Sequence, residues 1–249
     1  MRHIPDKSVD LVVTSPPYGT IRDYKNNWSL DLHSIGKEIN RVLRWGGVAC
    51  VVIQDGTKDF RKSLTTFRLA LDWCDNIGLG LFETAIYQRD GRPGAWWNKR
   101  FRVDHEYILI FLKGYKPKSF DKEPLKIPAK CAGSIFHGTQ RLTSGELVKI
   151  KKTVQKETKC RGTIWKYDAS KSERNKLKNK HPAPFPDALA KDLILCFSGK
   201  YDIILDPMCG SGTTCVMADK YDRRFIGIDI SIEYCEIAVQ RLANEAVKE

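Results

Sequence analysis

Short apolar runs alternate along this chain with segments whose apolar residues have helical spacing. The runs at 9–13 and 48–53 each have the length of a buried strand, and the segment 32–43 between them repeats apolar residues every three or four positions. The same order returns between residues 186 and 246. Such alternation predicts an α/β fold, with a mainly parallel twisted sheet and helices on both faces.

Glycines, prolines and capping residues set the other expected boundaries. The expected elements are a helix over 63–76, strands near 82–88 and 106–112, a helix from Pro186 to Phe197, a strand at 201–206, a helix over 210–220, a strand at 225–229 that ends at Asp229, and a helix capped by Ser231 and ending at Ala246. Two glycines at 46 and 47 are expected to end the helix over 32–43. The segment 113–180 has weak periodicity and scattered glycines and prolines, which predicts little regular structure.

Length and composition limit the class of protein. With 249 residues, 42% of them hydrophobic, the chain can bury the core of one large domain or of one domain with an insert. No apolar stretch approaches the roughly 20 residues of a membrane span, and the first residues lack the apolar core of a signal peptide. We therefore expect a cytoplasmic protein that does not enter a membrane. The eight cysteines include no CxxC pair and the five histidines no HExxH, so we expect reduced thiols and no metal site.

The positive charge of the chain is concentrated in one segment. Residues 113–180 contain 19 Lys and Arg against 6 Asp and Glu, an excess of 13, whereas the whole chain carries only +12. A basic insert on a nearly neutral body is typical of a polyanion-binding face, and a solvated lysine-rich loop is the alternative.

The sequence TSPPYG at 14–19 ends the first predicted strand in an unusual way. Pro16 and Pro17 fix φ at two consecutive positions and remove two N–H donors, so the chain leaves the sheet along a stiff, extended path. Such a loop suits a site in which atoms must be held still, although an isolated turn can look the same.

A second motif, DPMCGSGTT at 206–214, combines a strand end, a glycine-rich turn and a helix start. Backbone N–H groups and the positive end of a helix then face the place where a cofactor can lie. Asp229, 23 residues after Asp206, has the spacing of a carboxylate that binds ribose hydroxyls. Because the pattern is neither GxGxxG nor GK[ST], it favours a nucleoside cofactor without a diphosphate. An ordinary tight turn with a capping aspartate is the structural alternative.

Together, TSPPYG, DPMCGSGTT and FIGIDIS resemble the S-adenosylmethionine-dependent DNA amino-methyltransferases, and RVLRWGG, RFRVDHEYILIFLKG and HPAPFP add further matches. The order of these motifs is that of the beta group, a circular permutation of the usual order. The resemblance implies a Rossmann-like methyltransferase fold with three parts. These are a catalytic half at 1–112, a basic target-recognition insert at 113–180 and an S-adenosylmethionine-binding half at 181–249.

The resemblance also implies a mechanism. In the family, the first residue of the motif and the next carbonyl accept hydrogen bonds from the target amine, and the aromatic residue stacks on the base, which corresponds here to Ser15, Pro16 and Tyr18. The methyl group would move by direct displacement to the exocyclic amine of a flipped base in double-stranded DNA. Serine at the first position is commoner among enzymes that modify cytosine N4, so we favour cytosine N4 over adenine N6.

Further site residues follow from the matched motifs. The expected cofactor-binding residues are Asp206, Pro207, Gly210, Ser211, Gly212, Thr213, Asp229, Ile230, His181, Phe185 and Pro186. The expected DNA-binding residues are Arg22, Lys25, Lys99, Arg100, Lys151 and Lys152. A capping or core role for His181, and a solvated connection at Arg22 and Lys25, are the alternatives.

One departure from the family concerns the first residues. Most beta-group members carry a short strand ending in Gly-Asp before the segment that resembles IPDKSVDLVV, with which this chain nearly begins. In the family, the aspartate of that strand contacts the adenine of the cofactor. We therefore expect either that another residue takes its place or that the chain is an N-terminally shortened version, with weaker cofactor binding. A cognate restriction endonuclease is an expected partner, and the chain is expected to be a monomer or homodimer. Methylation of RNA or of protein glutamine, and a catalytically dead DNA-binding protein, are the alternative functions.

Overall fold

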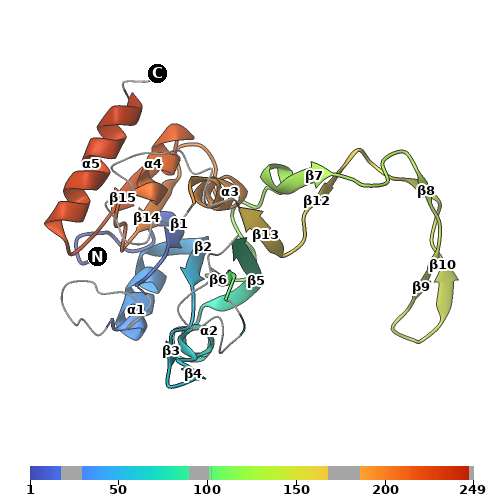
Figure 1. Ribbon diagram of the computed structural model, residues 1–249, viewed down its shortest axis with the longest axis horizontal. Helices are drawn as coiled ribbons and strands as arrows, with labels where there is room; N and C mark the ends of the chain where they lie inside the picture. Colours follow the sequence, from blue (N-terminus) through green and yellow to red (C-terminus); the bar gives the residue numbers. More distant parts are fainter. Residues whose placement is uncertain (18–29, 90–100, 102, 168–185, 247–249) are drawn as a thin grey trace. The chain divides into compact units, whose positions relative to one another are not determined.

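The computed structural model of this chain describes residues 1–17, 30–89, 101, 103–167 and 186–246 (Figure 1). These residues belong to two compact units. The larger unit comprises Met1–Asp121 and Thr163–Glu249, and the smaller unit comprises Lys122–Gly162.

A seven-stranded sheet forms the centre of the larger unit, with the strand order β13-β5-β6-β2-β1-β14-β15. The strands are β1 (Val9–Thr14), β2 (Leu43–Ile53), β5 (Gly80–Arg89), β6 (His105–Leu112), β13 (Ile164–Tyr167), β14 (Ile203–Asp206) and β15 (Arg224–Gly227). Only β6 runs antiparallel to its neighbours, β2 and β5, and the other four strand pairs are parallel. The predicted mainly parallel sheet is confirmed.

Helices cover both faces of this sheet (Figure 1). The helices are α1 (Leu32–Val42), α2 (Thr65–Asp75), α3 (Asp187–Phe197), α4 (Thr213–Lys220) and α5 (Ile232–Ala246). Helices α1 and α2 pack on each other, and α4 packs between α3 and α5. In Figure 1 the first pair lies below the sheet and the other three helices lie above it, as the sequence predicts for a doubly wound α/β fold.

Several element boundaries differ from those expected. Strand β2 begins at Leu43 and includes both glycines. Its pairing with β6 continues as far as these glycines, because the Gly46 N–H donates to the Lys113 carbonyl, just past β6, at 2.7 Å. Pro186 is the N-cap of α3, with ψ of 136°, and not its first helical residue. Strand β15 ends at Gly227, so Asp229 lies two residues beyond the strand.

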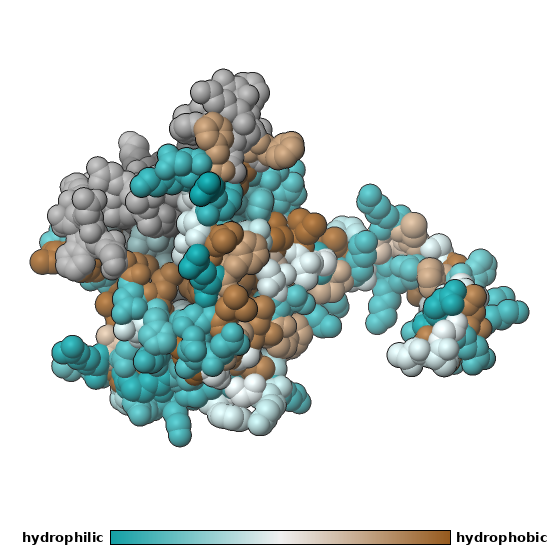
Figure 2. All heavy atoms as spheres, turned by 90° about the horizontal axis from the view of Figure 1, so that it is seen from below, coloured by the Kyte–Doolittle hydropathy of each residue, from teal (hydrophilic) through white to brown (hydrophobic). Residues whose placement is uncertain are grey.

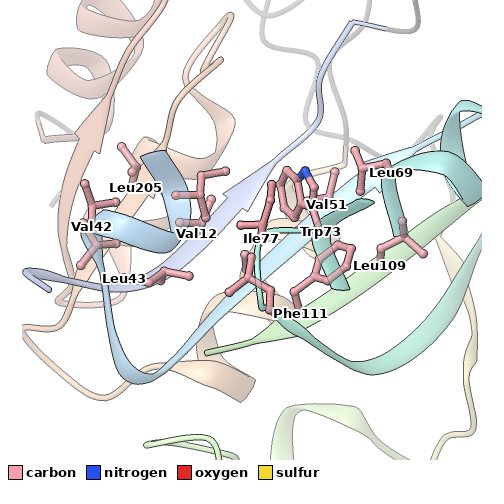
Figure 3. Packing of buried hydrophobic residues seen from close by; sticks show 14 of the residues in the cluster. Val12, Val42, Leu43, Val51, Leu69, Trp73, Ile77, Leu109, Phe111 and Leu205 are labelled. Atoms are coloured by element: carbon pink, nitrogen blue, oxygen red, sulfur yellow. The ribbon is translucent and has the colours of Figure 1, made fainter. Parts of the chain in front are cut away.

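The core below the sheet is built from wholly apolar strand faces and the inner faces of α1 and α2. Trp73 of α2 packs on Phe111 of β6 with ring centroids 4.9 Å apart, beside Ile77 and Leu109 (Figure 3). The α1 helix comes close to Trp73 because Gly36 has no side chain to separate them.

A buried carboxylate fixes β1 against β14. Asp10 of β1 is 4% exposed, and its Oδ2 accepts a hydrogen bond from the Ile203 backbone N–H at 2.9 Å. Lys118 and Arg44 lie 2.7 and 3.1 Å from its Oδ1, so the charge is paired. Lys118 also binds Asp202 at 2.9 Å, directly before β14. This set of contacts ties the two strands together at their amino-terminal ends.

The smaller unit consists of three nested antiparallel ladders, where little regular structure is expected from the sequence. Strands β7 (Lys126–Pro128) and β12 (Thr158–Cys160) pair, as do β8 (Ile135–Phe136) and β11 (Thr153–Val154), and β9 (Thr139–Arg141) and β10 (Leu147–Lys149). A single 3-10 turn, Glu123–Leu125, precedes β7. Several hydrophobic side chains of this unit are exposed. Figure 2 shows that exposed hydrophobic residues lie among hydrophilic ones on the surface of the molecule. This unit falls inside the predicted insert at 113–180, and β13, which also falls there, belongs to the central sheet.

Two further observations concern the part of the chain that the structure describes. None of its helices is long and apolar enough to cross a membrane. None of its His, Cys, Asp and Glu side chains cluster in a group that could hold a metal ion, and all eight cysteines are free thiols.

We predict that Gly36→Ala destabilises the protein, although the same change in an exposed helix stabilises by about 1 kcal/mol. A Cβ at position 36 would lie 2.4 Å from Trp73 Nε1, and that indole is held by a 3.1 Å hydrogen bond to the Leu32 carbonyl. We expect the free energy of unfolding to fall by about 1–3 kcal/mol in urea titrations. The control is Gly199→Ala, whose Cβ would meet nothing nearer than 3.6 Å. Equal stability of the two variants would contradict the prediction.

Candidate active site

The predicted catalytic loop leaves the sheet at the carboxyl end of its most buried strand. All six residues of β1 are buried, and after Thr14 the chain continues through half-buried Ser15, buried Pro16 and half-buried Pro17. Tyr18 lies outside the described residues. Because β1 is paired on both sides, the start of the loop is held in place by the sheet itself.

The loop lies beside the glycine-rich turn because the direction of winding reverses between β1 and β14. From β1 the chain crosses by α1 to β2 on one side, and from β14 it crosses by α4 to β15 on the other side. In open α/β sheets the crevice at such a switch point, outside the carboxyl ends of the strands, is where ligands bind. The hydroxyl of Thr214 in α4 donates to the Val13 carbonyl at 3.2 Å, which fastens the two halves of the site together.

The turn itself adopts a conformation that needs glycine. Gly210 and Gly212 have φ of 50° and 78°, and Gly212 is the N-cap of α4. A Cβ on Gly212 would lie 2.6 Å from the Cβ of Ala238 in α5, so the turn packs directly on that helix. Helix α4 begins at Thr213 and not at Gly210, so the turn lies between the end of β14 and the start of α4. The N–H groups of Cys209, Gly210 and Gly212 donate to acceptors within the protein.

Asp229 closes the turn from the other side. Its Oδ2 accepts the Gly210 N–H at 2.8 Å and its Oδ1 accepts the Ser231 N–H at 2.9 Å. The neighbouring Ile230 is 75% exposed. A carboxylate next to an exposed apolar side chain is a combination that can bind the hydroxyls of a ribose and cover one face of an adenine ring.

Arg241 is a buried support for the turn that the sequence analysis missed. This residue of α5 is 2% exposed, and its Nη1 donates to the Ser211 carbonyl at 2.5 Å and to the Thr213 hydroxyl at 3.2 Å. Its Nη2 lies 3.6 Å from Asp187, the first residue of α3. The guanidinium therefore connects the turn to the start of α3. Its only sequence signal was an arginine among the apolar residues of a helix.

Asp206, the last residue of β14, is a buried acid. Its Oδ1 accepts the Met208 N–H at 3.2 Å, and burial raises the pKa of its carboxyl group to about 6. The side chain is 2% exposed, so its ionisation is coupled to folding.

Other polar residues that the sequence analysis did not single out gather at the same edge of the sheet. Arg89 at the end of β5 binds Glu106 of β6 at 3.0 Å and Gln54, just past β2, at 3.4 Å. The Gln54 amide in turn donates to the His105 carbonyl at 2.7 Å. The sequence feature that could have predicted this group is the pair of polar residues directly after the apolar run at 48–53.

The structure does not reach every predicted site residue. Arg22, Lys25, Lys99, Arg100, His181 and Phe185 lie outside the described residues. Lys151 and Lys152 are exposed and belong to the smaller unit. Pro186 is buried directly before α3. The described residues that come together at the switch point are therefore those of the loop at 15–17, the turn at 206–213, and Asp229 with Ile230.

A mainly parallel, doubly wound sheet with a glycine turn and a Ser-Pro-Pro loop at its switch point has the Rossmann-like fold of a methyltransferase. The sequence model of the family N6_N4_Mtase, described as DNA methylase, matches residues 9–240, so this chain belongs to that DNA methylase family. It is a DNA amino-methyltransferase of the class that includes cytosine-N4 and adenine-N6 enzymes. The resemblance noted from the motifs is confirmed.

Curated relatives and solved structures agree with this assignment. The chain is 37% identical over 251 residues to the Orphan methyltransferase M.BamHII of Bacillus amyloliquefaciens, which covers 97% of this chain and 91% of that protein. It is 28% identical to the DNA adenine methyltransferase YhdJ of Escherichia coli K12, over 97% and 79% of the two chains. The solved PvuII DNA methyltransferase (cytosine-N4-specific) shares the fold with a TM-score of 0.72 at 23% identity, over 96% and 81% of the two chains.

We predict that Asp206 makes the stability of the ligand-free protein fall between pH 4 and pH 6. Below about pH 4 the Asp206 carboxyl group is protonated in the folded and in the unfolded protein. Above that pH it ionises first in the unfolded protein, because its pKa is about 3.9 there and about 6 in the folded protein. The resulting decrease in the free energy of unfolding reaches about 3 kcal/mol once the pH passes 6. In urea titrations, Asp206→Asn should gain stability relative to the native protein over this pH range.

The matched control for this pH dependence is Asp222→Asn. Asp222 is exposed, and its hydrogen bond with Lys200 lowers the pKa of the carboxyl group. Its replacement should shift stability slightly in the opposite direction. A difference between Asp206→Asn and the native protein that does not change with pH would rule out the buried ionisation.

Proposed function

We propose that this DNA methylase transfers the methyl group of S-adenosylmethionine to the N4 amine of a cytosine that has been flipped out of duplex DNA. The observation that carries the proposal is the meeting of the Ser15–Pro17 loop with the glycine turn at the switch point of the sheet. This arrangement suits one crevice that holds a nucleoside cofactor on one side and a target base on the other.

The residues at the turn fit this cofactor. Asp229 offers carboxylate oxygens to ribose hydroxyls, and Ile230 offers an exposed apolar surface next to them. A solved structure of TTHA0409 from Thermus thermophilus, with a TM-score of 0.63 and 24% identity over 98% and 89% of the two chains, is a complex with S-adenosyl-L-methionine. When bound, the sulfonium supplies an electrophilic methyl group. His181, Phe185 and Pro186 are proposed to line its methionine end.

The loop residues act on the amine. An exocyclic amine that is conjugated with its ring is a poor nucleophile, and the Ser15 hydroxyl and the Pro16 carbonyl are two acceptors for its N–H groups. Hydrogen bonds to these acceptors favour a geometry in which the nitrogen lone pair points at the methyl group. Pro16 and Pro17 keep the acceptors from relaxing, and Tyr18 stacks on the base.

DNA contacts are proposed for six basic residues. Lys151 and Lys152 of the smaller unit are exposed. We propose that the positively charged insert at 113–180 recognises the target DNA. It would separate a catalytic half at 1–112 from a cofactor-binding half at 181–249. Arg22, Lys25, Lys99 and Arg100 are proposed to bind the phosphate backbone. A cognate restriction endonuclease is also proposed as a partner. The name of the relative M.BamHII, orphan methyltransferase, does not support such a partner.

Adenine N6 is the second candidate target, and the observation in its favour is the similarity to the adenine methyltransferase YhdJ. Cytosine and adenine both present an amine next to a ring nitrogen. Ser15 favours cytosine, because the family more often has aspartate at this position in adenine enzymes.

We expect that unmethylated genomic DNA, incubated with the protein and S-adenosylmethionine, gains N4-methylcytosine. Digestion to nucleosides followed by mass spectrometry identifies the product. N6-methyladenine as the sole product would overturn the choice of base. Methylation of RNA or of protein glutamine with unmodified DNA would overturn the assignment of DNA as the substrate.

We predict that Ser15→Ala lowers kcat for DNA methylation by about 100-fold, because it removes one hydrogen-bonding partner of the reacting amine. Binding of S-adenosylmethionine, measured by calorimetry, should stay within about twofold. The matched control is Ser8→Ala at the other end of β1, where the hydroxyl donates to the Pro5 carbonyl at 2.7 Å. If Ser15→Ala instead lost cofactor binding and kept its turnover per bound cofactor, the role of Ser15 would be wrong.

A further inference from the structure

A short hairpin follows β2 and has a strained tip. Strand β3 (Thr57–Lys58) pairs with β4 (Arg61–Lys62), so that Asp59 and Phe60 form a two-residue turn. Both turn residues have left-handed backbone, with φ of 48° and 61°. Turns of this kind strongly prefer Asn-Gly or Asp-Gly, and a bulky aromatic residue at positive φ is a rare outlier. Strained backbone of this kind is enriched at functional sites, which makes the tip a candidate for a binding role.

The tip exposes an aromatic ring among positive charges. Phe60 is 58% exposed, and its neighbours Lys58 and Arg61 are exposed as well. An open hollow of about 520 Å³ lies beside the ring and is not lined by it; its lining residues are Gly56, Thr57, Lys58, Asp59, Arg61, Lys62 and Ser63. An exposed aromatic ring beside two cations matches the chemistry of nucleic acid, in which bases stack and phosphates carry the charge.

The hairpin stands at the same edge of the sheet as the catalytic loop. Strands β1 and β2 are parallel, and Thr14 pairs with Val51, so Ser15 and the residues after Ile53 leave the sheet in the same direction. The hairpin is also firmly held at its base. The Ser63 N–H donates to the Gly56 carbonyl at 3.0 Å, and the buried Asp55 accepts the Thr66 N–H of α2 at 2.9 Å. The base of the hairpin is therefore held by its own backbone pairing and by α2.

We propose that this hairpin is a DNA-binding element in which Phe60 stacks against the bases next to the flipped nucleotide, while Lys58 and Arg61 bind the flanking phosphates. The inference rests on the proposed function, because a flipped base leaves its neighbours unstacked. An aromatic side chain can cover the exposed base faces without regard to sequence. The two cations favour DNA over a second copy of this chain as the binding partner of the hairpin.

The decisive variant is Phe60→Gly, which separates stability from function. It converts the turn to Asp-Gly and relieves the strain at φ of 61°, so we expect the Tm to rise. Loss of the stacking surface should lower kcat/KM for a DNA duplex about tenfold or more, with S-adenosylmethionine binding unchanged. The duplex contains the methylated site of the native protein, found by sequencing, with 2-aminopurine beside the target base. The variant should lose most of the increase in 2-aminopurine fluorescence that accompanies flipping.

The matched control is Tyr201→Gly, which removes an aromatic side chain that is 69% exposed and also has left-handed backbone, with φ of 66°, just before β14 at the opposite edge of the sheet. It should keep the native kcat/KM and fluorescence. The double variant Lys58→Ala/Arg61→Ala should reduce the slope of log affinity against log salt by about 0.9 for each phosphate that it no longer binds. Lys220→Ala, at the exposed end of α4, should not change that slope.

Native kcat/KM and native fluorescence in Phe60→Gly would overturn the proposal, as would a lower Tm accompanied by an equal loss of cofactor binding. A shift from dimer to monomer in Phe60→Gly with unchanged DNA methylation would assign the ring to a contact between copies instead. Because the native protein is assayed on the same duplex, absence of methylation by the native protein would count against the proposed function and not against the hairpin.

Discussion

The parallel pairing of β1 with β14 is the contact on which the site depends. It joins segments separated by more than 180 residues, with Leu11 opposite Ile204 and Val12 opposite Leu205. Asp10 reinforces this register, because its buried carboxylate binds the Ile203 N–H and is paired with Lys118. A buried ion pair is a weak source of net stability, and its better attested use is to select one arrangement. Here that arrangement places the Ser-Pro-Pro loop beside the glycine turn.

The conformation of the glycine turn is fixed from several sides at once. Arg241 supports it from α5, Asp229 binds it from beyond β15, and Thr214 fastens the following helix to β1. A turn held in this way does not have to be ordered when a ligand binds to it, which lowers the entropic cost of binding. The hairpin tip at Phe60 is the opposite case, because its local geometry is strained and a better turn sequence exists.

Local sequence signals predicted the elements well where periodicity was strong, and less well where the chain interacts with distant segments. Helices α1 and α5 and strands β1 and β6 lie within a residue or two of their expected positions. Strand β2 extends through Gly46 and Gly47 because the end of β6 pairs with it there, which overrides the helix-ending signal of the two glycines. The ladders of the smaller unit were missed because each is only two or three residues long and depends on its partner strand.

The sequence by itself determined the alternation of strands and helices, the stiff loop at Ser15–Pro17 and the glycine turn with its later carboxylate, because these depend on residue type and short spacing. The tertiary structure alone decided which of these parts meet. Sheet order and register carry residues 15 and 206 to one crevice, bring Arg241 under the turn, and place Phe60 at the same edge of the sheet. Such contacts span long sequence separations, and they form only when the buried strands find one register in which every apolar face is covered.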